Sequence, residues 1–129
     1  MFAKLVPPHL AGPIAEFAAE YADTPFREGQ VYSVLVAAGY GVREIADLAD
    51  VDWDRVDLCL ALLGLVALGR DALDQGMIPL DLAAGIARLS ASNQQLMLNR
   101  WIRGDFRNAR HAERYAAAIQ ADEQPQLSL

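Results

Sequence analysis

Residues 39–65 read GYGVREIADLADVDWDRVDLCLALLGL, a pattern typical of two short helices. Glycines at its start break the preceding helix, and Ile45, Ala46 and Leu48 then recur at helical spacing. Asp50-Val51-Asp52 has the composition of a tight turn, and Asp52 suits the N-cap of a second helix. We therefore predict one helix over 42–49 and another over 53–63, joined by this turn.

Three positions in this helical pair have a packing requirement. We expect Ala46 to lie where the two helices cross closely, because only a small side chain fits there. Ile45 and Val56 are expected to pack into the core beneath the turn. These constraints define a pair of helices, and they bear on the fold more than on the function.

The same helical periodicity continues on both sides of this pair. No segment alternates between polar and apolar residues over a length that would predict a strand. The fold class that we expect is all-α, a multi-helix domain of about seven or eight helices that contains a helix-turn-helix. The other predicted helices cover residues 13–22, 25–38, 67–75, 79–89, 94–103 and 107–121.

Local signals set several of these boundaries. Pro13 and Pro25 suit a first helical turn, Thr24 can cap the second helix, and Gly76 can end a later one. Helical spacing then predicts which residues face the core in the first two helices. They are Ile14, Phe17, Ala18, Tyr21, Val31, Val34, Leu35 and Ala38.

The length of 129 residues suits one domain between two short irregular segments. We expect an irregular N-terminal arm over 1–12, the helical domain over 13–121 and a flexible tail over 122–129. Hydrophobic residues make up 53% of the chain and charged residues 22%, which is typical of a globular protein. The net charge of −6 argues against tight, sequence-independent binding to nucleic acid.

The sequence lacks the patterns of a secreted or membrane protein. Cys59 is the only cysteine, which rules out an internal disulfide and fits a reducing compartment and a small buried side chain. The apolar run over 58–68 is far shorter than the ~20 residues of a membrane span, and the first residues form no signal peptide. We expect a cytoplasmic protein without a membrane partner.

The sequence also lacks the patterns of an enzyme or a metalloprotein. His9 and His111 are far apart, and neither has metal-ligand spacing with another ligand. Residues 50–54 resemble the start of a calcium loop, but Arg55 and Ala61 stand where that loop needs Gly and Glu. There is no phosphate-binding glycine loop and no triad pattern. We expect no catalytic residue, no cofactor and no metal.

The helical pair at 39–65 resembles the helix-turn-helix of ParB/KorB-type partition proteins. The matching positions are the Gly that ends the preceding helix, Glu44-Ile45-Ala46, Val56 and the apolar ending at 62–65. The similarity continues through residues 73–78 to Ala83 and Leu89, and in helix spacing alone over 94–119. It covers about three quarters of the chain, and its specificity rests on several short matches in the right order.

The resemblance implies the central DNA-binding domain of a partition or transcription-regulating protein of bacterial, plasmid or phage origin. Its expected partner is double-stranded DNA with a palindromic site, and a DNA-binding protein of this kind would associate with the nucleoid. The chain departs from the family in lacking its arginine-rich nucleotide-binding signature and its C-terminal dimerisation domain. We therefore expect neither a CTP-driven clamp nor strong self-association, but a monomer or weak dimer.

The second helix of a helix-turn-helix enters the major groove with its first turns. The candidate base-contacting residues are therefore Asp52, Trp53, Asp54, Arg55 and Asp57. Arg55 could read guanine, an Asp could accept from cytosine N4, and Trp53 could stack or touch a thymine methyl. In the structural alternative Asp52 caps the helix, Trp53 packs on the first helix of the motif, and the other two carboxylates are solvated.

Arginines are concentrated in the C-terminal third. Residues 88–114 carry six arginines and two acidic residues, whereas residues 42–57 carry two arginines and six acidic residues. If the turn at Gly104 keeps the helical register, several of these arginines form one basic edge that could contact phosphates; otherwise they are a solvated helical face. The candidate contacts to the DNA backbone are Arg43, Arg88, Arg100, Arg103, Arg107, Arg110 and Arg114.

Two functions remain open. In the first, the chain is a sequence-specific DNA-binding module, as the resemblance implies. In the second, it is a degenerate, acidic helix-turn-helix that binds a protein partner through Trp53 and its neighbouring carboxylates. The negative charge of the recognition helix favours the second function, and the family resemblance favours the first.

Overall fold

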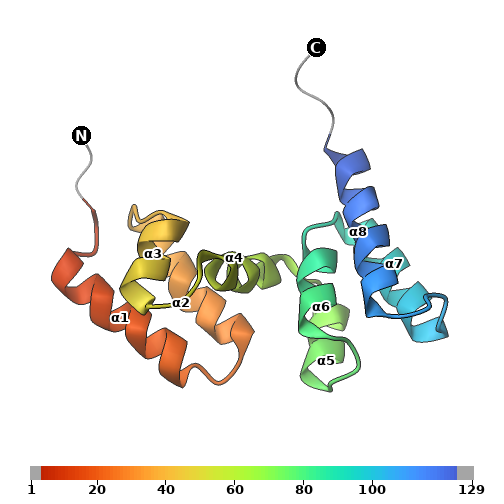
Figure 1. The fold of residues 1–129 in the computed structure, drawn as a ribbon, viewed down its shortest axis with the longest axis horizontal. Coiled ribbons are helices and arrows are strands. Elements are labelled where there is room, and N and C mark those ends of the chain that lie inside the picture. The colour runs from red at the N-terminus through yellow and green to blue at the C-terminus, as the bar shows by residue number, and fades with distance from the viewer. Residues whose placement is uncertain (1–3, 125–129) are drawn as a thin grey trace, which may run out of the picture. The chain divides into compact units, whose positions relative to one another are not determined.

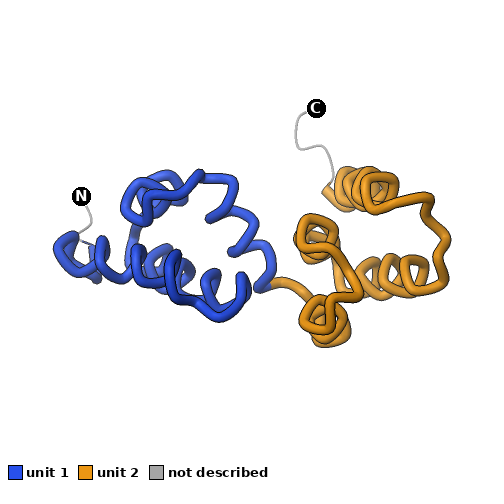
Figure 2. The backbone as a smooth tube through the Cα atoms, turned by 60° about the horizontal axis from the view of Figure 1, so that its bottom comes forward, with its two compact units in different colours: residues 1–63 blue, residues 64–129 orange. Residues whose placement is uncertain are grey.

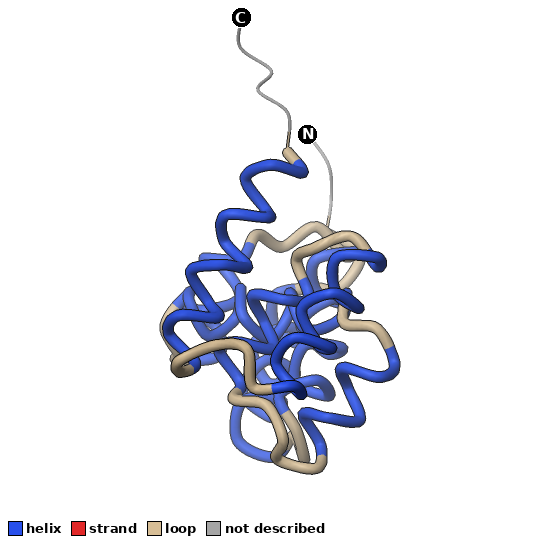
Figure 3. Tube along the Cα trace, turned by 90° about the vertical axis from the view of Figure 1, so that its right-hand side faces the viewer, coloured by secondary structure: helices blue, strands red, loops and turns tan. Residues whose placement is uncertain are grey.

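The computed structural model describes residues 4–124, which contain helices and no strand (Figures 1 and 3). This confirms the predicted all-α class and the expected number of helices. The helices are α1 (Pro8–Tyr21), α2 (Pro25–Ala37), α3 (Val42–Ala49), α4 (Trp53–Ala61), a 3₁₀ turn η1 (Leu62–Gly64), α5 (Ala67–Asp74), α6 (Leu80–Ala87), α7 (Ala91–Arg103) and α8 (Ala109–Glu123). None of them, within residues 4–124, has the length and apolar character needed to cross a membrane.

The chain forms two compact units, residues 1–63 and residues 64–129, coloured separately in Figure 2. In the first unit α2 packs on α4, and α1 packs on α2 and α3. In the second unit α6 packs on α7 and α8. Each unit buries apolar side chains of its own, and the expected domain over 13–121 spans both.

The first helix begins earlier than predicted. Pro7 is extended and its carbonyl accepts hydrogen bonds from the amides of Leu10 and Ala11, both at 3.0 Å. Pro8 therefore takes the first helical position, where a missing N–H costs nothing. Pro13, the predicted start, lies inside the helix. The expected irregular arm over 1–12 thus already contains the first turn of α1.

The predicted inner faces of the first two helices are partly wrong. Phe17 and Tyr21 are each 64% exposed, and Val34 is 56% exposed. The buried face of α1 consists of Ala11, Ala15 and Ala18, and that of α2 of Glu28, Gly29, Tyr32 and Leu35. The alanines of α1 let it pack closely on its neighbours, which leaves Phe17 and Tyr21 on its outer side.

Gly29 shows how close that approach is. A Cβ atom at this position would lie 2.1 Å from the carbonyl oxygen of Cys59 on α4. No side chain fits between these two backbones, so α2 meets α4 at a glycine. The orientation of α4 therefore depends on its contact with α2 as well as on the turn that precedes it.

Gln94 organises the start of the second unit. Its side chain is buried, and its Oε1 accepts from the amide of Val66 at 2.8 Å. Its Nε2 donates to the carbonyls of Gly64 at 2.9 Å and Leu89 at 3.0 Å. One side chain thus joins the segment before α5 to the end of α6 and the first turn of α7.

The ends of the last two helices also differ from the prediction. α7 begins at Ala91, with Ser90 as its cap, three residues before the predicted start. α8 begins at Ala109 because Asn108 caps it, accepting from the amide of His111 at 2.8 Å. It continues to Glu123, so the first residues of the expected tail are helical. Residues 125–129 of that tail lie outside the described part of the chain.

Candidate functional site

The two short helices α3 and α4 form a helix-turn-helix, with the first helix over the predicted range. Asp50 ends α3 in the left-handed conformation, with φ +58°, which Asp tolerates better than most residues. The amide of Val51 then donates to the carbonyl of Ala46 at 3.1 Å, and the Val51 side chain packs against the core. This turn reverses the chain into α4.

The interior of the motif agrees with the prediction. Ile45, Ala46 and Val56 are all buried, and so is Cys59 one turn further along α4. Burial raises the pKa of the Cys59 thiol to about 12, so the thiol is protonated at neutral pH and unreactive. The interior of the motif is therefore held together by apolar packing. Any contact with a partner must be made by the exposed side chains.

The predicted cap of α4 is only half correct. Asp52 does occupy the N-cap position, and its carbonyl accepts from the amide of Arg55 at 3.0 Å. However, no amide of the described helix α4 donates to its carboxylate. The carboxylate is exposed, so it adds negative charge to the surface at the start of α4.

Arg55, the candidate guanine reader, is held by a buried carboxylate of the same unit. Its Nη2 lies 2.7 Å from Glu28 Oε1, and its Nε donates to Glu28 Oε2 at 3.3 Å. The hydroxyl of Tyr32 donates to the same Oε2 at 2.6 Å. The hydrogen bond from Arg55 to Glu28 raises the pKa of Arg55, and burial, followed by the contact with Glu28, raises the pKa of Tyr32.

Sequence reasoning missed Glu28. The signal for it was weak but present: an acidic residue four positions before a tyrosine, on the face of α2 that also carries Gly29. A buried carboxylate needs a cationic partner, and Arg55 on the neighbouring helix provides it. Arg55 thus ties α4 to α2.

The exposed side of α4 is aromatic and acidic. Trp53 is 45% exposed, and the guanidinium of Arg43 on α3 lies 5.0 Å from the centre of its ring. Asp54 and Asp57 are also exposed. The structure therefore brings two candidate residues, Arg43 and Trp53, into contact with each other at the front of the motif.

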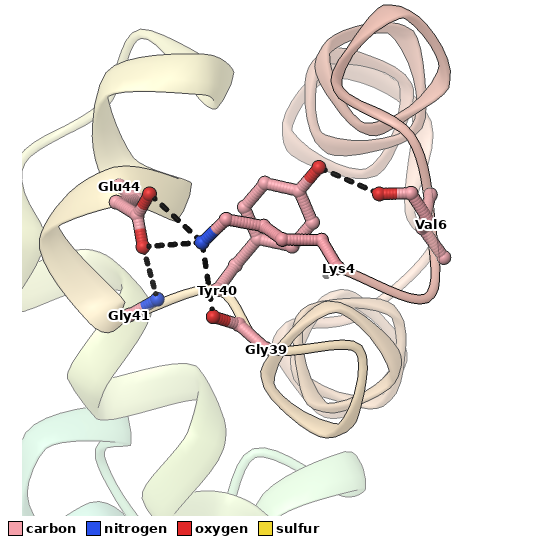
Figure 4. Close-up of polar contacts among 6 residues, drawn as sticks. All are labelled: Lys4, Val6, Gly39, Tyr40, Gly41 and Glu44. Atoms are coloured by element: carbon pink, nitrogen blue, oxygen red, sulfur yellow. Dashed lines mark hydrogen bonds and ion pairs between the residues drawn. The ribbon is translucent and has the colours of Figure 1, made fainter. Parts of the chain in front are cut away.

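An N-terminal segment holds the start of the motif's first helix (Figure 4). The ammonium of Lys4 donates to the carbonyl of Gly39 at 3.0 Å and to both carboxylate oxygens of Glu44 at 3.1 Å, and it lies 4.3 Å from the centre of the Tyr40 ring. Glu44 also accepts from the amide of Gly41 at 2.9 Å. The hydrogen bonds from Gly41 and Lys4 lower the pKa of Glu44.

Two of the candidate arginines in the second unit converge on one carboxylate. Arg100 Nε lies 3.5 Å from Asp105 Oδ2, and Arg103 Nη2 lies 2.8 Å from the same oxygen. The Arg100 guanidinium also lies 4.9 Å from the ring centre of Phe106 and 4.5 Å from that of Tyr115. Arg100 is therefore held between α7 and α8, whereas the Arg103 side chain is 65% exposed.

The remaining candidates do not continue the helical register across the turn. Gly104 ends α7 with φ +78°, and Arg107 lies in the irregular segment before α8. Arg110 and Arg114 are exposed one turn apart on α8. Arg88, at the end of α6, is exposed and donates to the carbonyl of Ala84 at 3.4 Å.

Comparison with known proteins identifies the fold of the chain. No protein-family model and no curated protein matches the sequence. The structure is similar to that of the DNA-binding domain of the chromosome-partitioning protein ParB, solved as a complex with the centromeric parS site. The TM-score is 0.74 at 18% identity, over 96% of this chain and 88% of that domain. The chain therefore has a ParB-like all-helical fold, as the pattern of residues 39–65 indicated.

Proposed function

We propose that this chain is a DNA-binding helix-turn-helix module of a ParB/KorB-like partition or transcription-regulating protein. The observation that carries the proposal is the likeness of nearly the whole chain to a domain that was solved on its DNA site. The turn between α3 and α4 supports it, because the second helix after such a turn is the one that enters the major groove in DNA-binding helix-turn-helix proteins.

Within this proposal, base contacts come from the exposed start of α4. Trp53 is available for an apolar contact with a thymine methyl, and the carboxylates of Asp52, Asp54 and Asp57 can accept from cytosine N4. Arg55 acts mainly by holding α4 against Glu28, so guanine readout by Arg55 is a smaller part of the proposal. Arg43 on α3, stacked on Trp53, supplies a cation beside this aromatic side chain.

Phosphate contacts are assigned chiefly to α8 and the segment before it. In the part of the chain that the structure describes, Arg107, Arg110 and Arg114 have no ion-pair partner, so they can bind phosphate without breaking an internal contact. Arg103 is exposed but forms an ion pair with Asp105, so this carboxylate competes with phosphate for Arg103. Arg88 and Arg100 complete the proposed set as weaker contributors.

The experiment that tests this function is selection of binding sites from a random duplex library at low salt, followed by sequencing. We expect enrichment of a palindromic site whose affinity falls as salt is added. Selection that enriches no sequence, from a protein shown to be helical by circular dichroism, would overturn the proposal.

One observation favours a second function. Because Arg55 is bound to Glu28, the exposed surface of α4 is dominated by Asp52, Asp54 and Asp57. Such a surface is repelled by phosphate and fits a basic protein partner. In that case Asp54→Asn and Asp57→Asn would weaken binding to the protein partner, whereas in the DNA model the same changes reduce repulsion and strengthen sequence-independent DNA binding.

A further inference from the structure

The first unit leaves an apolar face uncovered on α1 and α2, outside the helix-turn-helix. On α1 the small alanines are buried and the large Phe17 and Tyr21 lie outside, with their ring centres 5.0 Å apart. On α2 Val34 is exposed in the same way. An aromatic pair beside an exposed valine is costly to leave in water, and clustered apolar side chains on a surface mark a contact site.

These side chains line one groove. An open hollow of about 530 Å³ lies between α1 and α2, and its lining includes the apolar Phe17, Tyr21, Val31 and Val34 and the charged Asp23 and Arg27. Both walls are helices, so the hollow runs along a helix pair. This geometry fits an amphipathic helix that inserts its apolar side chains at helical spacing.

The charges around the groove indicate which helix it accepts. Glu16 and Glu20 are exposed beside Phe17 and Tyr21 on α1, and Asp23 follows them. Arg27 is the one basic residue that lines the hollow among the residues described there. The first unit as a whole has ten acidic and four basic residues. A second copy of this chain would bring like charges together, whereas a helix with basic flanks would meet opposite ones.

We propose that the groove between α1 and α2 is the docking site for an amphipathic helix of a protein partner, with an apolar stripe flanked by Lys and Arg. Phe17 and Tyr21 are its anchors, since buried aromatic side chains contribute most of the energy of such interfaces. Glu16 and Glu20 select the basic flanks and speed association. The site is separate from α4 and does not depend on DNA binding.

The probe for this site is a synthetic amphipathic peptide of about 18 residues, long enough to form a helix, with leucines on one face and lysines on its flanks. It is titrated into the full chain while backbone amide shifts are followed by NMR. We expect shifts concentrated in residues 14–34. A matched peptide with glutamates in place of the lysines should cause none.

Variants separate the apolar and the charged contributions. Phe17→Ser with Tyr21→Ser should weaken binding of the lysine peptide about tenfold or more, because it removes both anchors. Glu16→Gln with Glu20→Gln should remove most of the salt dependence of binding. Leu96→Ser, at an apolar side chain on α7 that is 44% exposed, should leave binding unchanged.

Three results would overturn the proposal. The first is a set of shifts that maps to α3 and α4, because the peptide would then be attracted to the acidic recognition helix. The second is equal binding of the glutamate peptide. The third is a dimer in sedimentation equilibrium that Phe17→Ser and Tyr21→Ser dissociate, since the groove would then hold a second copy of this chain.

Discussion

Arg55 has the residue type and the position of a base-reading residue, but in this structure it forms an ion pair with the buried Glu28. Glu28 is 4% exposed, and its carboxylate receives hydrogen bonds from Arg55 and from Tyr32. If Arg55 turned toward a base, a carboxylate would be left buried with a single neutral donor. The ion pair therefore holds Arg55 in place and fixes the orientation of α4.

Replacing Arg55 should affect stability before it affects any binding. We expect Arg55→Ala to lower the free energy of unfolding by roughly 2 kcal/mol, below the usual cost of breaking a buried pair because the Arg55 side chain is 39% exposed. Urea denaturation measures this change. Arg43→Ala is the matched control and should stay within about 0.5 kcal/mol of the unaltered protein. Equal effects of the two substitutions would contradict the structural role of Arg55.

Helices in the second unit are joined at their ends by side chains as well as by packing. Gln94, at the fourth position of α7, bonds to backbone groups that precede α5 and follow α6. Glu123, at the end of α8, accepts from the amide and hydroxyl of Ser90 and from the side chain of Asn93. The start of α7 is thus attached to three other parts of the unit.

The role of Gln94 can be tested against its neighbour in sequence. Gln94→Leu should destabilise the protein by roughly 2 kcal/mol, because it removes the partner of the buried Leu89 carbonyl and of the part-buried Val66 amide and Gly64 carbonyl. Gln95→Leu, at an exposed position of the same helix, should change little. Thermal unfolding followed by circular dichroism compares the two, and similar midpoints would show that the buried amide contributes no net stability.

The stability of the fold should depend on the protonation state of Glu123. Hydrogen bonds from Asn93 and then Ser90 lower its pKa below the ordinary value of 4.5. A carboxyl whose folded pKa is lowered stabilises the fold above its unfolded pKa, and this stabilisation is lost as the pH falls through the folded pKa. Glu123→Ala should therefore lower the thermal midpoint at neutral pH and converge with the unaltered protein below pH 4.5. Asp122→Ala is the control for removing one exposed charge and should show no such convergence.

Charge is divided unevenly along the chain. The first unit has ten acidic and four basic residues, whereas the second has seven of each. The second unit is therefore the one that can approach a polyanion without net repulsion, and its exposed cations include Arg107, Arg110 and Arg114. In the proposed DNA complex, affinity comes mainly from these arginines and specificity from α4.

The uneven distribution of charge between the two units predicts how the salt dependence of DNA binding will change in variants. For the site enriched by selection, Arg110→Ala with Arg114→Ala should weaken binding to all sequences alike and reduce the slope of log affinity against log salt by about 2. Arg27→Ala, an exposed arginine on α2, should leave that slope unchanged. The slope is obtained from fluorescence anisotropy titrations over a range of salt. A loss of sequence preference at constant slope would mean that these two arginines read bases.

Much of the fold could be predicted from residues that act on their immediate neighbours. The range of α3, the turn at Asp50 and the cap by Thr24, which accepts from the amide of Arg27 at 3.1 Å, follow from side chains within one helical turn. The all-helical class follows from periodicity, which is also a local property. The same holds for Ile45, Ala46 and Val56, whose burial is tied to the geometry of the turn.

Other features depend on which surfaces meet after the chain has folded. Periodicity identifies the apolar residues of α1 but not whether its alanines or Phe17 and Tyr21 are buried, since that choice depends on how closely α2 and α3 approach. The pairing of Arg55 with Glu28 joins residues 27 positions apart and changes a candidate base reader into a support for α4. Helix propensity and capping act over a few residues, whereas burial and ion pairing depend on distance in space, so the helices and the interior of the helix-turn-helix could be predicted while the buried face of α1 and the partner of Arg55 could not.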